Sequence, residues 1–170
     1  MFYFIHATTI DNFKKIISSK YIYAPYYAPF KVQGLSYVAY TKFVFTNLFL
    51  NEFPLREDEH AGTGQITLII DPLILKYKKC YVNPYGWVGG IYDRTIVMNN
   101  NVDLVLDLVK KNYRFPLVTS NEALFRKNIS TKFIIGVICK PEYDDIVQKY
   151  LDENDLSYVK IFRQFPVLLE

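Results

Sequence analysis

The order of the strand-like and helix-like segments constrains the fold of this chain most. Amphipathic patterns predict helices near residues 10–19, 102–112 and 141–153. Short apolar runs predict strands at 2–6, 43–46, 66–70, 80–82, 122–125, 132–139 and 158–162. The two kinds of segment do not alternate regularly, so the order favours an α+β fold. We expect one domain over residues 1–170, with a split, mostly antiparallel sheet and flanking helices.

The first strand-like run ends in a histidine and leads directly into a helix. His6 and Thr8 stand two residues apart in His6-Ala7-Thr8, so a strand places both side chains on one side. Such a pair can hold a polar ligand. A histidine at a strand end can equally be held by a backbone hydrogen bond, and Thr8 or Thr9 can equally cap the helix. Both interpretations stay open.

The charge of the chain is mild. The net charge is +3, and the basic residues are scattered in pairs such as Lys14-Lys15, Lys78-Lys79 and Lys110-Lys111. Such pairs are typical of solvated faces, and a dedicated nucleic-acid groove is expected to carry more charge. The charge therefore permits an anionic ligand without requiring one.

The cysteines and histidines do not form a metal-binding pattern. Cys80 and Cys139 lie far apart among apolar residues, and the chain has two histidines, so we expect buried thiols and no metal. The glycine-containing segment 84–90 also lacks the spacing of a phosphate-binding loop. With neither a signal-like N-terminus nor an apolar run long enough for a bilayer, we expect a cytoplasmic protein.

Three motifs occur in an order that resembles a known superfamily. His6-Ala7-Thr8 comes first, the aromatic run 43–49 follows, and Glu122 opens a late strand, Glu122-Ala123-Leu124-Phe125, before a second apolar strand. This order resembles the ADP-ribosyltransferase superfamily, in its branch with an N-terminal His-x-[Ser/Thr] and a late glutamate. It is similar to the bacterial DNA-modifying ADP-ribosyltransferase toxins and to poly-ADP-ribose-polymerase-like folds. The likeness spans roughly residues 2–139.

The resemblance implies a transferase that uses NAD as its substrate and needs no metal. By resemblance, His6 binds the ribose next to nicotinamide and Thr8 supports it. Glu122 is the catalytic residue: its carboxylate bonds the ribose 2′-hydroxyl and stabilises the oxocarbenium-like state that forms when nicotinamide leaves. An aromatic ring is expected to stack on nicotinamide. The candidates for that ring are Tyr40, Phe43 and Phe45.

Two departures from the superfamily pattern bear on the acceptor. Ser120 stands two residues before Glu122, where the arginine-modifying branch carries Glu or Gln, and the first motif has His in place of Arg. Both disfavour arginine as the acceptor. The acceptor can otherwise be a protein, a nucleic acid or a small molecule.

Two alternative functions remain open. The chain can be a binding protein on a degenerate transferase fold, which would not need Glu122. It can also be a metal-independent phosphoesterase of the class that uses two His-x-[Ser/Thr] motifs. His60 fits that class less well than His6, because its hydroxyl, Thr63, lies three residues on and would face the other side of a strand.

Overall fold

The computed structural model describes residues 2–31, 42–50, 64–84, 95–112 and 122–163. Its ten strands are β1 (Phe2–Thr8), β2 (Tyr21–Tyr23), β3 (Phe43–Leu50), β4 (Ile66–Ile70), β5 (Cys80–Asn83), β6 (Ile96–Val97), β7 (Glu122–Arg126), β8 (Asn128–Ser130), β9 (Ile134–Cys139) and β10 (Lys160–Phe162). The α-helices are α1 (Ile10–Ser19), α2 (Val102–Asn112) and α3 (Asp144–Asp152). Short 3₁₀ turns include η1 (Pro25–Tyr27), η2 (Pro72–Lys76), η5 (Thr131–Phe133) and η6 (Pro141–Tyr143).

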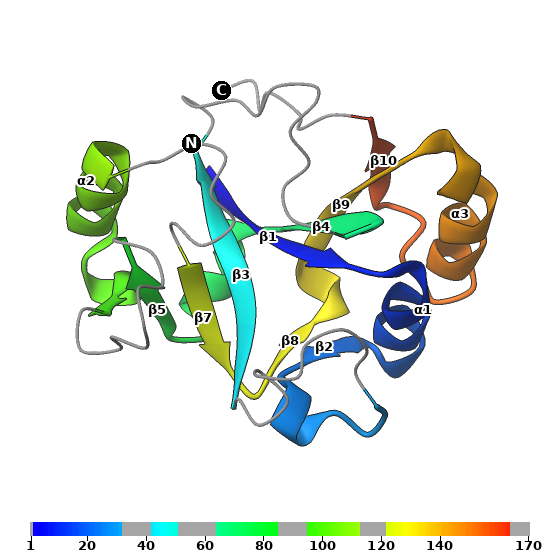
Figure 1. Ribbon diagram of the computed structural model, residues 1–170, viewed down its shortest axis with the longest axis horizontal. Coiled ribbons are helices and arrows are strands. Elements are labelled where there is room, and N and C mark those ends of the chain that lie inside the picture. The colour runs from blue at the N-terminus through cyan, green and yellow to red at the C-terminus, as the bar shows by residue number, and fades with distance from the viewer. Residues whose placement is uncertain (1, 32–41, 51–63, 85–94, 113–121, 164–170) are drawn as a thin grey trace.

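The described strands form one eight-stranded sheet and one two-stranded sheet. The large sheet has the order β10-β9-β4-β1-β3-β7-β5-β6, and β2 pairs with β8. Every neighbouring pair is antiparallel except β9 and β10, which are parallel and are joined through α3. The expected α+β class with a mostly antiparallel sheet is therefore confirmed (Figure 1).

The large sheet is split between β1 and β3. These strands pair from Phe2 opposite Leu50 to Ile5 opposite Asn47, and their pairing ends there. β1 then continues along β4 as far as Thr8, while the start of β3 runs along β7 from Phe43. The two strands therefore diverge in a fork, visible in Figure 1, and this fork is the expected split.

The three α-helices pack on one face of the sheet, here called the helical face. Buried residues from all three helices join Phe4, Leu68 and Phe125 of the sheet in one apolar cluster. The second face carries a separate, smaller cluster. Its buried members are Tyr3, Ile5, Phe49 and Ile69, and Phe162 of β10 packs against them. The ring of Tyr3 stacks on that of Phe49 with centroids 4.9 Å apart.

Local signals explain why α1 begins and ends where the sequence predicts. The Thr9 hydroxyl accepts a hydrogen bond from the Asn12 backbone N–H at 3.2 Å, so Thr9 and not Thr8 is the N-cap. The Gln65 side chain accepts a second bond from the Ile10 backbone N–H at 3.0 Å. The helix ends at Lys20, whose φ of 62° is left-handed and whose backbone N–H bonds Ile17.

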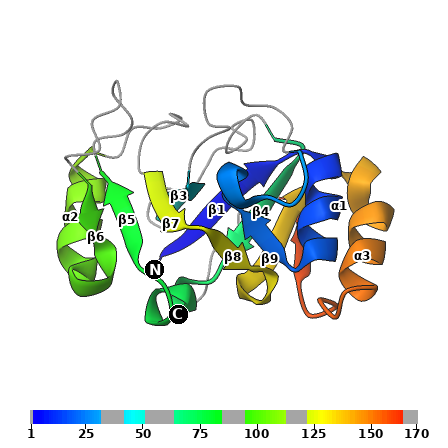
Figure 2. The ribbon, with the colours of Figure 1, turned by 90° about the horizontal axis from the view of Figure 1, so that it is seen from below.

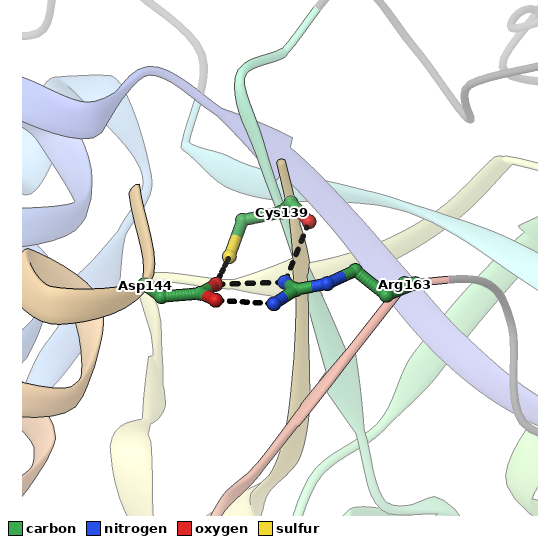
Figure 3. Close-up of polar contacts among 3 residues, drawn as sticks. All are labelled: Cys139, Asp144 and Arg163. Carbon is green, nitrogen blue, oxygen red and sulfur yellow. Dashed lines mark hydrogen bonds and ion pairs between the residues drawn. The ribbon is translucent and has the colours of Figure 1, made fainter. Parts of the chain in front are cut away.

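The end of the described chain is fixed to the rest by three side chains. Arg163 forms a two-pronged ion pair with Asp144, and its Nη1 also donates to the Cys139 carbonyl at 3.3 Å (Figure 3). The Cys139 thiol donates to Asp144 at 3.6 Å. Burial and the nearby Asp144 carboxylate raise the pKa of Cys139 to about 11, so its thiol is unreactive at neutral pH. Cys80 and Cys139 are both free and buried, as expected.

The sequence prediction differs from the structure at several segment ends. β1 runs to Thr8 and β3 to Leu50, beyond the strands predicted at 2–6 and 43–46. The predicted helix at 141–153 is a 3₁₀ turn, η6, followed by α3, and the predicted strand at 132–139 begins as the turn η5. The last strand, expected at 158–162, covers 160–162. The strands β2, β6 and β8 have two or three residues each and were not predicted.

Candidate functional site

His6 lies at the fork between β1 and β3. Its Nδ1 donates a hydrogen bond of 2.8 Å to the backbone carbonyl of Phe45, in the part of β3 that no longer pairs with β1. Burial lowers the pKa of His6 below its usual value, and the Phe45 bond opposes this only partly. The ring is therefore neutral at pH 7, with a proton on Nδ1 and Nε2 left as an acceptor. The imidazole links the two strands where the ladder ends.

Thr8 stands on the same side of β1 as His6 and is buried. It pairs with Ile66 at the end of β1, and the backbone of Gly64 comes very close to it. A Cβ on Gly64 would lie 2.6 Å from the Thr8 backbone nitrogen, so only glycine fits there without a shift. Thr8 is thus held firmly at the open end of the fork.

Glu122 is the first residue of β7 and lies in a row of residues that crosses four strands. It is directly opposite Asn47 of β3 and Asn83 of β5, and Asn47 is in turn opposite Ile5 of β1. Directly opposed residues in antiparallel strands point to the same face. Glu122 and the two asparagines therefore form a polar row on the second face, away from the α-helices.

The surroundings of Glu122 change how it titrates. Its side chain is half-buried, and burial raises its pKa to about 7. The carboxyl is therefore close to half ionised at neutral pH, which suits a group that gains and loses protons there. On the helical face, the Thr46 hydroxyl of β3 donates a hydrogen bond of 2.8 Å to the Ala123 carbonyl of β7 and fixes β7 next to Glu122.

Aromatic side chains follow the polar row on the second face. Phe45 lies opposite Leu124, and Leu124 lies opposite Tyr81, which together form the next row on this face. Phe43 follows on β3, and its ring meets that of Tyr81 edge-on, with centroids 6.0 Å apart. Two of the three expected aromatic residues, Phe43 and Phe45, therefore share a face with Glu122. The third, Tyr40, lies outside the described residues, as do Ser120 and His60.

His6 and Glu122 lie on strands two apart in the sheet although they are far apart in the sequence, and their side chains leave the sheet on opposite faces. Ile5, the neighbour of His6, is two strands from Glu122 in the same row, a separation of about 10 Å at the usual strand spacing. Side chains alternate along β1, so the His6 side chain points to the helical face. Its ring donates a hydrogen bond to the Phe45 carbonyl at the fork. That His6, Thr8 and Glu122 contact one ligand stays a prediction.

A family model matches residues 1–116, and its description reads "Family of unknown function (DUF5846)". The chain belongs to this family. No curated protein matches the DUF5846 chain. The match covers β1, the fork and β5, and it ends before Glu122.

Solved structures resemble the DUF5846 chain along nearly its whole length. DarT of Thermus sp. 2.9 in complex with carba-NAD⁺ superimposes with a TM-score of 0.66 at 14% identity, covering 95% of both chains. The same protein with NAD⁺ gives 0.61 at 15% identity and the same coverage. Its complex with ADP-ribosylated single-stranded DNA gives 0.63 at 14% identity, covering 95% of this chain and 94% of that one. The DUF5846 chain therefore has the ADP-ribosyltransferase fold.

Sequence reasoning missed three residues around Glu122. Asn47 and Asn83 flank it directly, and Tyr81 belongs to the neighbouring aromatic row. Asn47 was visible inside the aromatic motif, but only the strand register shows that it faces Glu122. Asn83 and Tyr81 gave no signal, because β5 becomes a neighbour of β7 only in the folded sheet.

The described residues contain neither a metal-binding cluster nor a helix that could span a membrane. No group of three or more His, Cys, Asp or Glu side chains in this part of the DUF5846 chain is arranged to hold a metal ion. Among the helices of the described ranges, none has the length and apolar character needed to span a bilayer.

Proposed function

We propose that this DUF5846 chain is an NAD-dependent ADP-ribosyltransferase with Glu122 as its catalytic residue. The observation that carries the proposal is the position of Glu122. It opens β7 on the second face, beside two asparagines and near two phenylalanines, within a fold that matches NAD-bound DarT over 95% of both chains.

The proposed reaction breaks the bond between nicotinamide and the ribose C1′ of NAD and joins C1′ to a nucleophile of the acceptor. Nicotinamide leaves with the bonding electrons, and the acceptor loses a proton. The Glu122 carboxylate stabilises the positive charge that develops on the ribose. Because its pKa is about 7, the same group is suited to receive the acceptor's proton near neutral pH.

The other candidates have supporting roles in this proposal. The neutral His6 ring holds its Nδ1 proton on the Phe45 carbonyl, which leaves Nε2 to accept a bond from a ribose hydroxyl. Thr8 supports the ligand next to it. Phe43 and Phe45 share the face of Glu122 and are the described candidates for stacking on nicotinamide, together with Tyr40.

The first test uses Glu122→Gln, which keeps the shape and loses the negative charge. The wild type is expected to bind NAD in calorimetry and to release nicotinamide, measured by chromatography, when offered protein and nucleic-acid acceptors. Glu122→Gln is expected to release nicotinamide about 100-fold more slowly or worse, because one electrostatic stabiliser is lost. Glu153→Gln removes the same charge from the exposed end of α3 and should leave the rate unchanged.

The result also separates the alternative functions. A wild type that binds no NAD would contradict the transferase proposal and favour a binding protein on this fold. A phosphodiesterase activity lost in both His6→Ala and His60→Ala would favour the phosphoesterase instead.

A further inference from the structure

Lysines and tyrosines that are scattered in the sequence meet at the end of the molecule where β7 turns into β8. We call this set, Tyr26, Lys42, Tyr77, Lys78, Lys127 and Lys132, the basic–aromatic surface. The backbone N–H of Lys127 donates to the Lys42 carbonyl at 3.0 Å. Lys78 reaches the same turn, where its Nζ donates to the Arg126 carbonyl at 3.4 Å and to the Asn128 side chain at 2.9 Å. Figure 2 looks onto this end of the molecule, with β7 and β8 near its centre.

The two tyrosines of the surface are exposed and carry lysines beside their rings. Tyr26 is 57% exposed, and the Lys42 Nζ lies 5.3 Å from its ring centroid. Tyr77 is 66% exposed, and the Lys132 Nζ lies 5.4 Å from its ring centroid. A single exposed ring is ordinary on a protein surface, but a lysine held over the ring makes a cation–π pair. Each ring here has a cation next to it.

The lysines of the surface are not neutralised within the described part of the chain. Its ion pairs involve Lys14, Lys20, Lys149 and Arg163, and none involves Lys42, Lys78, Lys127 or Lys132. Lys127 stands close enough to Lys78 to help lower its pKa, after the larger effect of burial. A chain with a net charge of only +3 therefore concentrates positive charge at one end.

We propose that the basic–aromatic surface binds single-stranded nucleic acid, either DNA or RNA. Lysines neutralise phosphates, and exposed rings stack on bases, which a single strand presents and a duplex hides. An acidic protein would use the lysines but would leave the rings without a role. The surface is separate from the Glu122 site. It begins at the far end of β7, about 13 Å along the strand from Glu122.

Fluorescence anisotropy without NAD tests the surface independently of catalysis. The probes are labelled oligothymidine and oligouridine of about 20 nucleotides, longer than the usual site of one binding fold. The wild type is expected to bind at least one of them with strong salt dependence. The triple variant Lys42→Gln, Lys127→Asn and Lys132→Gln should lower the slope of log affinity against log salt by about 2. Asparagine is chosen at 127 because φ there is 69°.

Matched variants separate this surface from general charge. Lys111→Gln, Lys140→Gln and Lys160→Gln together remove the same charge from exposed positions on α2, before η6 and on β10, and should leave the slope nearly unchanged. Tyr26→Ala with Tyr77→Ala should weaken binding about tenfold or more, and the two Tyr→Phe changes should not.

Three outcomes would overturn the proposal. The first is that neither probe binds in a salt-dependent way. The second is that both lysine triple variants lower the salt slope equally. The third is that polyglutamate or duplex DNA binds as tightly as the single strands. Because NAD is absent from this assay, a failure of the transferase proposal would leave its result unaffected, and the reverse also holds.

Discussion

Glu122 carries a stability cost in the folded protein as well as a proposed role. Burial raises its pKa to about 7, well above the value of an exposed glutamate. Between about pH 4.5 and 7 the folded chain therefore holds a proton that the unfolded chain has released. By linkage, the contribution of this group to stability falls as the pH rises through that window, and the cost is complete above pH 7.

The variant Glu122→Gln should show this cost directly. It is expected to be more stable than the wild type at pH 8, by on the order of 1 kcal/mol after allowance for partial exposure, and to show a much smaller difference at pH 5. Urea denaturation at the two pH values measures it. The same difference at both values would contradict the raised pKa.

Two variants of His6 separate its structural bond from its proposed ligand role. His6→Ala leaves the Phe45 carbonyl without its partner and is expected to cost about 1 kcal/mol of stability. His6→Asn retains a donor close to the position of Nδ1 and should recover most of that stability. It lacks Nε2, so under the proposed function it should still bind NAD weakly in calorimetry. If His6→Asn bound NAD as tightly as the wild type, His6 would be a structural residue only.

At the scale of elements, two glycines differ in what surrounds them. A Cβ on Gly64 would meet the backbone of Thr8 at 2.6 Å, whereas a Cβ on Gly136 would meet the side chain of Phe162 at 2.6 Å. Backbone cannot move without disturbing the end of β1, but a ring on the edge strand β10 can turn aside.

Gly64→Ala is therefore expected to destabilise the chain by about 2–3 kcal/mol, and Gly136→Ala by clearly less. Chemical denaturation of both variants provides the comparison. If Gly136→Ala proved the more costly, the close approach of residue 64 to β1 would not be the tighter constraint.

The long periodic segments could be predicted from the sequence, and the features that depend on pairing could not. α1 and α2 match their predicted bounds because each shows its period within a few turns, and β4 matches because it is a continuous apolar run. β2 and β8 are three residues each and exist because they pair with one another across the chain. The fork at Ile5 and Asn47 depends on register, which no local pattern reveals.

The distribution of charge over the folded protein is the feature that the sequence predicts least completely. Lysine pairs such as Lys78-Lys79 are isolated along the chain, and such isolated pairs are typical of solvated faces. The β7–β8 turn, η2 and the start of β3 bring lysines of separate segments together. A count of basic residues describes the amount of charge, and only the fold shows where it gathers.

The ends of the large sheet have a consequence for how these molecules behave in concentrated solution. Within the described residues, the sheet is bounded by β6, with two residues, and β10, with three. An unpaired strand edge invites another chain to add to it, and short edges carrying lysine, such as Lys160, offer little for it to pair with. In the part of the chain that the structure describes, the strand order thus leaves the large sheet of this tyrosine-rich, half-apolar chain little edge for edge-to-edge aggregation.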